Sequence, residues 1–170
     1  MLTVIMECRD QETELAQTLS VLVAGAVEGL ISDVVVLDHG SRDASARVAD
    51  AAGCRFHTAW DIKDIVQSVR GEWLLLMEPG ARPQVGWINE LQEHLAMNRK
   101  PAKFSPSRNH LPSFFKRLTH RVPPLEHGFV MPKAQALSVA RSGMSLEQLV
   151  QKQKTFMLIS EMVPAWAARG

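Results

Sequence analysis

The chain has 170 residues, of which 46% are hydrophobic and 22% charged, and its 19 basic and 18 acidic side chains leave a net charge of +1. This composition is typical of a globular protein and excludes intrinsic disorder. A chain of this length can bury one sizeable core, which argues against a second independent domain.

Residues 1–98 contain four short apolar runs of the kind that form buried strands. Strands are predicted at residues 3–6, 33–38, 54–57 and 73–77. Continuous apolar runs, two of them β-branched, suit strands that are covered on both faces of a parallel sheet.

Helical patterns separate and follow these strands. Apolar spacings of three and four residues and helix-ending signals predict helices at residues 15–30, 41–53, 61–69 and 83–97. Either Ser41 or Asp43 could be the N-cap of the second helix, and Pro83 is expected to begin the fourth. The alternation predicts an α/β fold, with a doubly wound, mainly parallel sheet flanked by helices.

The character of the chain changes from residue 99 onward. Residues 99–133 contain eight Lys or Arg side chains and a single acid, Glu126, and prolines interrupt any regular pattern. A strand is then predicted at residues 129–131, a helix at 134–141 and a helical stretch from about Ser145.

The cysteines and the apolar segments bear on the compartment. Cys8 and Cys54 fall near opposite ends of two predicted parallel strands, too far apart for a disulfide, so we expect reduced thiols. The N-terminus lacks the basic region and cleavage site of a signal peptide. The apolar stretch 19–31 is shorter than the roughly 20 residues of a membrane-spanning helix. We therefore expect a cytoplasmic protein.

Three loops are candidates for a binding site, because ligands of open parallel sheets bind at the carboxyl ends of the strands. They are residues 7–10, 38–43 and 78–82, and each contains a carboxylate and an arginine. Gly40 and Ser41 lead into a helix N-terminus, where backbone N–H groups favour phosphate. The alternative for Asp38, Asp43 and Glu78 is a purely structural or solvated role. The histidines and cysteines lack zinc-ligand spacing, and no Walker or GxGxxG loop is present.

The segment Asp38-His39-Gly40-Ser41-Arg42-Asp43 resembles the Asp-Asp-Gly-Ser-x-Asp motif of family 2 glycosyltransferases, which have the GT-A fold. Three weaker similarities accompany it. Residues 7–10 align with Pro-x-Tyr-Asn of that family, Ile62-Lys63 with its Arg-Asn pair, and residues 70–74 with its Arg-Gly-Glu-Tyr-Ile. The resemblance covers roughly the first ninety residues.

This resemblance implies a GT-A-like (Rossmann-like) fold with a shortened C-terminal half. It divides a single expected domain, residues 1–170, into a nucleotide-binding half (1–98) and a basic, acceptor-side half (99–170). It also implies binding of a UDP- or GDP-sugar. The residues expected to bind it are Glu7, Arg9, Asp10, Asp38, Gly40, Ser41, Asp43, Lys63 and Arg82.

The chain departs from the family at the Asp-x-Asp motif, which holds Mg²⁺ or Mn²⁺ on the sugar-nucleotide diphosphate. Glu78-Pro79-Gly80 stands in its place, so one carboxylate remains as an incomplete metal site. A hard divalent cation needs several oxygen ligands, so metal use is in doubt. Arg42, Lys63 or Arg82 could instead neutralise the diphosphate through direct contacts.

Glu147 is the candidate general base, because it lies nearest to where the family supplies one. An inverting transfer needs a base that deprotonates the acceptor hydroxyl. The alternative is an exposed residue in the first turn of a helix that Ser145 caps.

The segment that begins at Leu111 and ends at Arg121 is basic and amphipathic. It could bind an anionic membrane surface, or its apolar side chains could cover the sheet while its charges are solvated. No nucleic-acid partner is expected, because the whole-chain charge is near zero and no reading motif is present.

Three functions are compatible with these patterns. The leading hypothesis is a glycosyltransferase-like protein that binds a nucleotide sugar and transfers the sugar to an envelope saccharide or a lipid-linked acceptor. The second is a non-catalytic GT-A-fold binding or regulatory module that has lost metal-dependent transfer. The third is a membrane-surface scaffold.

Overall fold

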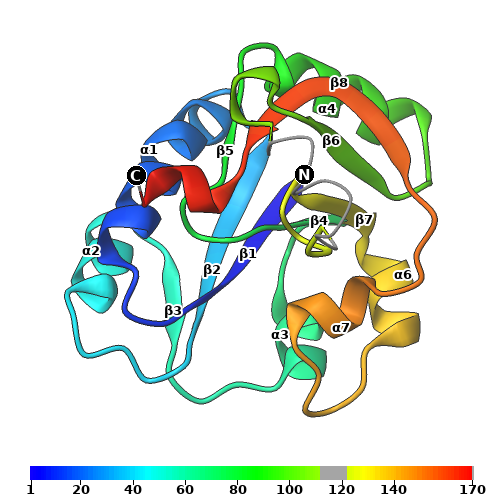
Figure 1. Cartoon of the computed structure of the whole chain (residues 1–170). Coiled ribbons are helices and arrows are strands. Elements are labelled where there is room, and N and C mark those ends of the chain that lie inside the picture. Colours follow the sequence, from blue (N-terminus) through cyan, green and yellow to red (C-terminus); the bar gives the residue numbers. More distant parts are fainter. Residues whose placement is uncertain (112–121, 170) are drawn as a thin grey trace.

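A computed structural model describes residues 1–111 and 122–169, and one eight-stranded sheet runs through it (Figure 1). The strands lie in the order β3-β2-β1-β4-β7-β6-β8-β5. They are β1 (Leu2–Cys8), β2 (Ile31–Asp38), β3 (Arg55–His57), β4 (Trp73–Leu76), β5 (Arg82–Pro83), β6 (Ala102–Pro106), β7 (Phe129–Pro132) and β8 (Phe156–Val163). The α-helices are α1 (Glu12–Val27), α2 (Ser45–Ala51), α3 (Ile62–Ser68), α4 (Trp87–Met97), α6 (Lys133–Val139) and α7 (Leu146–Val150). Two short 3₁₀ helices are η1 (Arg108–His110) and η2 (Ala165–Ala168).

The four strands predicted within residues 1–98 form the parallel part of the sheet. β1 pairs in parallel with β2 and β4, and β2 pairs in parallel with β3. Residues 2–6 of β1 are all fully buried, because this strand has neighbours on both edges and helices on both faces. Double burial explains why β1 is continuously apolar rather than alternating. The predicted parallel arrangement is confirmed here.

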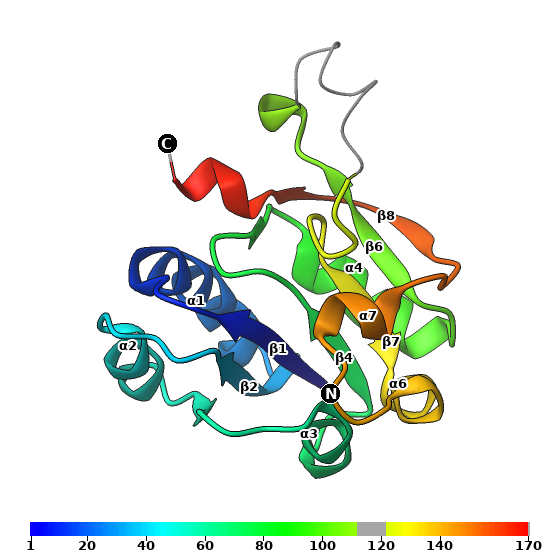
Figure 2. The same cartoon turned by 60° about the horizontal axis from the view of Figure 1, so that its bottom comes forward.

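Two apolar clusters cover the two faces of the sheet. Val4 and Met6 belong to the cluster that includes Leu15 of α1, whereas Ile5 belongs to the cluster that includes Ile62 of α3. Successive residues of β1 therefore face opposite helix layers. Figure 2 shows α1 and α3 on opposite sides of β1. The fold is doubly wound, as predicted.

The remaining strands complete the sheet in mixed orientation. β7 is antiparallel to β4 and β6, β8 is parallel to β6, and β5 is antiparallel to β8. β7 confirms the strand expected at residues 129–131, whereas β5, β6 and β8 are strands that the sequence patterns did not predict.

The helical stretch expected from Ser145 is wrong beyond Val150. The chain turns through Lys152, which has a positive φ of 62°, and residues 156–163 form β8. Phe156, Met157 and Ile159 of this strand are exposed, so apolar residues on both faces hide the alternation that normally marks a half-buried strand.

The helix expected to begin at Pro83 is also displaced. Arg82 and Pro83 form β5, and α4 begins at Trp87 after Gly86, whose φ is 89°. Proline suits this place because β5 is the outermost strand of the sheet and an edge strand tolerates a missing N–H donor.

Within the described ranges, no helix is both long and apolar enough to traverse a bilayer. The basic segment that begins at Leu111 lies, apart from that first residue, outside the described residues.

Candidate functional site

A pocket of about 390 Å³ opens at the carboxyl ends of β1 and β4. Four glutamates from separate segments of the chain line it, together with one tryptophan and one arginine. They are Glu7, Glu78, Glu126, Glu147, Trp166 and Arg169. Three of these glutamates, Glu7, Glu78 and Glu147, are residues that the sequence patterns singled out, and the fold brings them together at the edge where ligands of such sheets bind.

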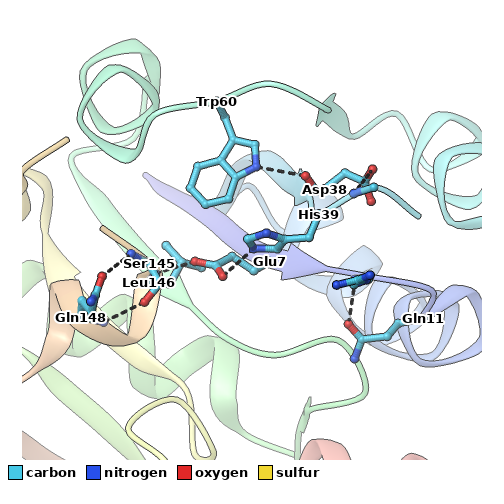
Figure 3. Close-up of polar contacts among 10 residues, drawn as sticks. Glu7, Gln11, Asp38, His39, Trp60, Ser145, Leu146 and Gln148 are labelled. Carbon is cyan, nitrogen blue, oxygen red and sulfur yellow. Dashed lines mark hydrogen bonds and ion pairs between the residues drawn. The ribbon is translucent and has the colours of Figure 1, made fainter. Parts of the chain in front are cut away.

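Glu7 connects β1 to two other parts of this edge (Figure 3). Its Oε1 accepts a hydrogen bond of 2.6 Å from the backbone N–H of Leu146, at the start of α7. Its Oε2 lies 2.9 Å from Nε2 of His39. Ser145 caps α7 in a capping box with Gln148. The helix that carries Glu147 is therefore fixed at its N-terminus from two sides.

His39 extends these contacts to the loop after β2 (Figure 3). Its ring lies edge-on to Trp60, with ring centroids 5.2 Å apart, and Trp60 Nε1 donates a 3.2 Å hydrogen bond to the carbonyl oxygen of Asp38. A second, smaller hollow of about 260 Å³ lies beyond His39, lined by Trp60 and by residues 143–145.

The carboxylate of Asp38 holds the loop that follows it. It accepts hydrogen bonds from the backbone N–H groups of Gly40 and Ser41, at 3.0 and 3.1 Å, and from the Ser41 hydroxyl. Gly40 has a φ of 83°, which a residue without a side chain adopts at little cost. Asp38 is only 5% exposed.

Asp10 and Asp43 are likewise engaged by the loops. Asp10 Oδ1 accepts from Arg42 N at 2.6 Å, and the two oxygens of Asp43 accept from Glu12 N and Ser45 N at 3.0 and 2.9 Å. The structural alternative considered for Asp38 and Asp43 therefore describes what their oxygens do here. Neither Ser41 nor Asp43 is the N-cap of α2, however, because that helix begins at Ser45 after Ala44.

The electrostatics of the pocket act most strongly on Glu78. Burial raises the pKa of Glu78, and the negative charges of Glu147 and Glu126 raise it further, while Arg169 opposes the shift. Glu126 is 8% exposed, and its Oε1 lies 3.7 Å from Nε2 of His127. Burial lowers the pKa of His127, and the neighbouring Glu126 opposes that change.

No family model and no curated protein matches the sequence. The structure is similar to glucosyl-3-phosphoglycerate synthase from Mycobacterium tuberculosis, solved with Mn²⁺, UDP and glucosyl-3-phosphoglycerate, at 15% identity and a TM-score of 0.58 over 80% of this chain. Another complex of that enzyme, with Mn²⁺, UDP-glucose and phosphoglyceric acid, gives a TM-score of 0.57 at 15% identity over 80% of this chain. A further mycobacterial protein gives 0.61 at 17% identity over 82% of this chain. This chain has the GT-A fold. It spans 58%, 57% and 55% of the length of these three solved chains.

Common ancestry of the activity does not follow from a shared GT-A fold, so the metal site must be judged from the residues present. Gly80 has a φ of 99°, and its N–H donates a 2.7 Å hydrogen bond to Thr18 Oγ1. A Cβ at position 80 would lie 2.9 Å from the carbonyl oxygen of Ala165 and 3.1 Å from Cβ of Ala168. Backbone of η2 therefore crowds the position where a second metal-binding carboxylate would begin.

The described residues also lack an alternative metal centre. In the part of the chain covered by the structure, no group of three or more His, Cys, Asp or Glu side chains converges so as to hold a metal ion. The residues of this GT-A domain therefore do not fit the Mg²⁺ or Mn²⁺ that the sequence resemblance implies, although Glu78 lies in the pocket.

The cations expected at the site lie elsewhere in the GT-A domain. Lys63 is exposed in the first turn of α3, after the N-cap Asp61, and neither it nor Arg82 of β5 lines the pocket. Arg9 and Arg42 are exposed on the loops after β1 and β2 and do not line it either.

Arg169 is the pocket cation that sequence patterns missed. It follows η2, which is positioned by the unpredicted strand β8, so no local pattern placed it beside the loops after β1 and β4. Glu126 carried a weak signal, as the single acid within residues 99–133.

Proposed function

We propose that the chain binds a nucleotide-diphospho-sugar along the carboxyl edge of the sheet and transfers the sugar to an acceptor hydroxyl. The observation that carries this proposal is the convergence of Glu7, Glu78, Glu126 and Glu147 in one pocket at the ligand edge of a GT-A sheet. Similar solved structures contain UDP or UDP-glucose, which supports a nucleotide sugar as the ligand class.

The chemistry of the pocket suits the sugar part of such a ligand. Ionised carboxylates accept hydrogen bonds and sugar hydroxyls donate them. Trp166, which is 46% exposed, offers an apolar surface beside these acceptors. The nucleoside would lie along the loops after β1 and β2, beyond Gln11 of the pocket wall, where Arg9 and His39 are exposed.

Glu147 is the proposed base. It is exposed, and it lines the pocket together with Glu78. In the transfer, the acceptor oxygen bonds to the anomeric carbon, its proton passes to Glu147, and the bond from that carbon to the diphosphate oxygen breaks, so that the diphosphate leaves with the electron pair. Glu78, whose pKa is raised, would contact the sugar in its partly protonated form.

The non-catalytic module remains the second candidate because of Gly80. The crowding at this position removes the usual basis for metal-assisted transfer without closing the pocket. A cytoplasmic location, an envelope saccharide or lipid-linked acceptor, and membrane contact through the segment after Leu111 stay predictions.

The test is a binding and turnover experiment on the whole chain. Thermal shift and calorimetry with UDP, GDP, UDP-glucose and GDP-mannose, each with Mn²⁺ and with EDTA, would measure donor binding. A ligand at a hundredfold its dissociation constant is expected to stabilise the fold by about 2.7 kcal/mol. Nucleotide release from the bound sugar nucleotide, with saccharide and lipid acceptors, would measure transfer.

The outcomes separate the two candidates. Turnover that Glu147→Gln abolishes while donor binding persists supports the transferase. Binding without turnover for any acceptor supports the non-catalytic module. No binding of any nucleotide or nucleotide sugar, under either condition, would refute both.

A further inference from the structure

The segment after β8 brings a positive charge to the glutamate pocket. η2 lies against the turn that contains Gly80, and Arg169 follows it directly. Figure 1 shows this C-terminal segment beside α1. Arg169 Nε lies 3.3 Å from Glu14 Oε1 of α1, and the arginine side chain is 59% exposed. Arg169 is therefore tethered to the helix but accessible from the pocket.

Arg169 is the single Lys or Arg among the described residues that line this pocket. Its charge acts on Glu78, because it opposes the rise in the pKa of that carboxyl. The ion pair with Glu14 engages Nε. Within the described ranges, neither terminal nitrogen of Arg169 has a hydrogen-bond partner.

The protein itself compensates most of the negative charge around the pocket. The carboxylate of Glu7 is held by the Leu146 N–H and by His39. Glu126 lies beside His127, and the raised pKa of Glu78 favours its neutral form. Glu147 is the remaining exposed carboxylate. One guanidinium can therefore change the balance of charge that an incoming anion meets.

We infer that Arg169 binds the diphosphate of the donor nucleotide directly, so that this site binds its anionic ligand without a divalent cation. The inference deepens the proposed function and rests on it. A guanidinium presents paired N–H groups that match two phosphate oxygens, and it carries its charge at every physiological pH. The backbone of η2, which excludes a second metal-binding carboxylate at position 80, is the same element that positions Arg169.

The test compares nucleotide binding in EDTA and in Mn²⁺ for the wild-type chain and matched variants. UDP and GDP are the probes, measured by calorimetry. Wild-type affinity is expected to be the same under both conditions. Arg169→Ala is expected to weaken binding about 10- to 100-fold, the range of charge-assisted hydrogen bonds, and Arg169→Lys to recover part of the loss. Arg47→Ala, which removes an exposed arginine from α2, is expected to have no effect.

A further variant separates the ligand contact from the structural one. Glu14→Gln removes the ion pair with Arg169 but retains the guanidinium, so binding is expected to persist. Loss of binding in Glu14→Gln equal to that in Arg169→Ala would overturn the inference, because the arginine would then act only through the helix.

The remaining outcomes distinguish this inference from the proposed function. Nucleotide binding that requires Mn²⁺, or an Arg169→Ala variant that binds as tightly as Arg47→Ala, would overturn the inference and leave the proposed function standing. A wild-type chain that binds no nucleotide in either condition would sink the proposed function, and this inference with it.

Discussion

Replacing Thr18 by valine is expected to destabilise the turn that carries Glu78. The Thr18 hydroxyl, on the fully buried face of α1, accepts a 2.7 Å hydrogen bond from Gly80 N and donates a 2.9 Å hydrogen bond to Ala81 O. Valine has nearly the same shape but no hydroxyl. The substitution therefore leaves one buried donor and one buried acceptor without partners.

The magnitude follows from these two groups. A buried polar group that loses its partner costs about 1–3 kcal/mol, so Thr18→Val is expected to lower the free energy of unfolding by about 2–5 kcal/mol. Thr18→Ser is the matched control. It retains both hydrogen bonds and removes one methyl group, which costs about 1 kcal/mol.

Urea unfolding, followed by tryptophan fluorescence, measures both variants. In a domain of this size the difference corresponds to a lower melting temperature, by about 2–4 °C for each kcal/mol. Donor binding is expected to weaken in Thr18→Val, because the loosened turn carries Glu78 into the pocket. A Thr18→Val variant as stable as Thr18→Ser would refute the reasoning.

Three further outcomes are expected. Gly80→Ala should lower the melting temperature more than Gly53→Ala, since both glycines have positive φ but only Gly80 is crowded, and Gly80→Asp should gain no Mn²⁺ binding by calorimetry; equal effects of the two alanines would contradict the packing at η2. Glu78→Gln should raise the melting temperature at pH 7 but not below pH 4.5, because a carboxyl with a raised pKa loses stability as pH rises through that pKa; a gain that is independent of pH would contradict the burial of this charge. Glu7→Ala should lower the free energy of unfolding by about 1–3 kcal/mol, because it orphans the Leu146 N–H. Hydrogen exchange should then speed up in α7, and unchanged protection there would show that Glu7 does not hold the helix.

The parallel half of the fold could be predicted because its signals are local. β1, β2 and β4 are apolar runs buried on both faces, and the apolar stripe of α1 repeats at helical spacing. The predicted strands differ from the observed ones mainly at their ends. β8 could not be predicted in this way, since its exposed Phe156 and Ile159 give no alternation, and β6 lies in a proline-interrupted stretch.

Part of the site was predictable for the same kind of reason. Glu7 and Glu78 stand at the ends of predicted parallel strands, so the rule that ligands bind at carboxyl edges selected both. Glu147 was selected by the family resemblance, which its place in the pocket agrees with. Lys63 and Arg82 were selected by alignment and chemistry, and the paths of α3 and β5 carry them away from the pocket.

The sequence by itself determined which segments become strands and helices, because periodicity and capping act over a few residues. Tertiary structure alone decided which charges meet. Glu7 and Leu146 are 139 positions apart, and Arg169 reaches Glu14 only after β8 has crossed the sheet beside β6. Interactions between charges depend on distance and burial, and both are set by strand order and loop path rather than by local sequence.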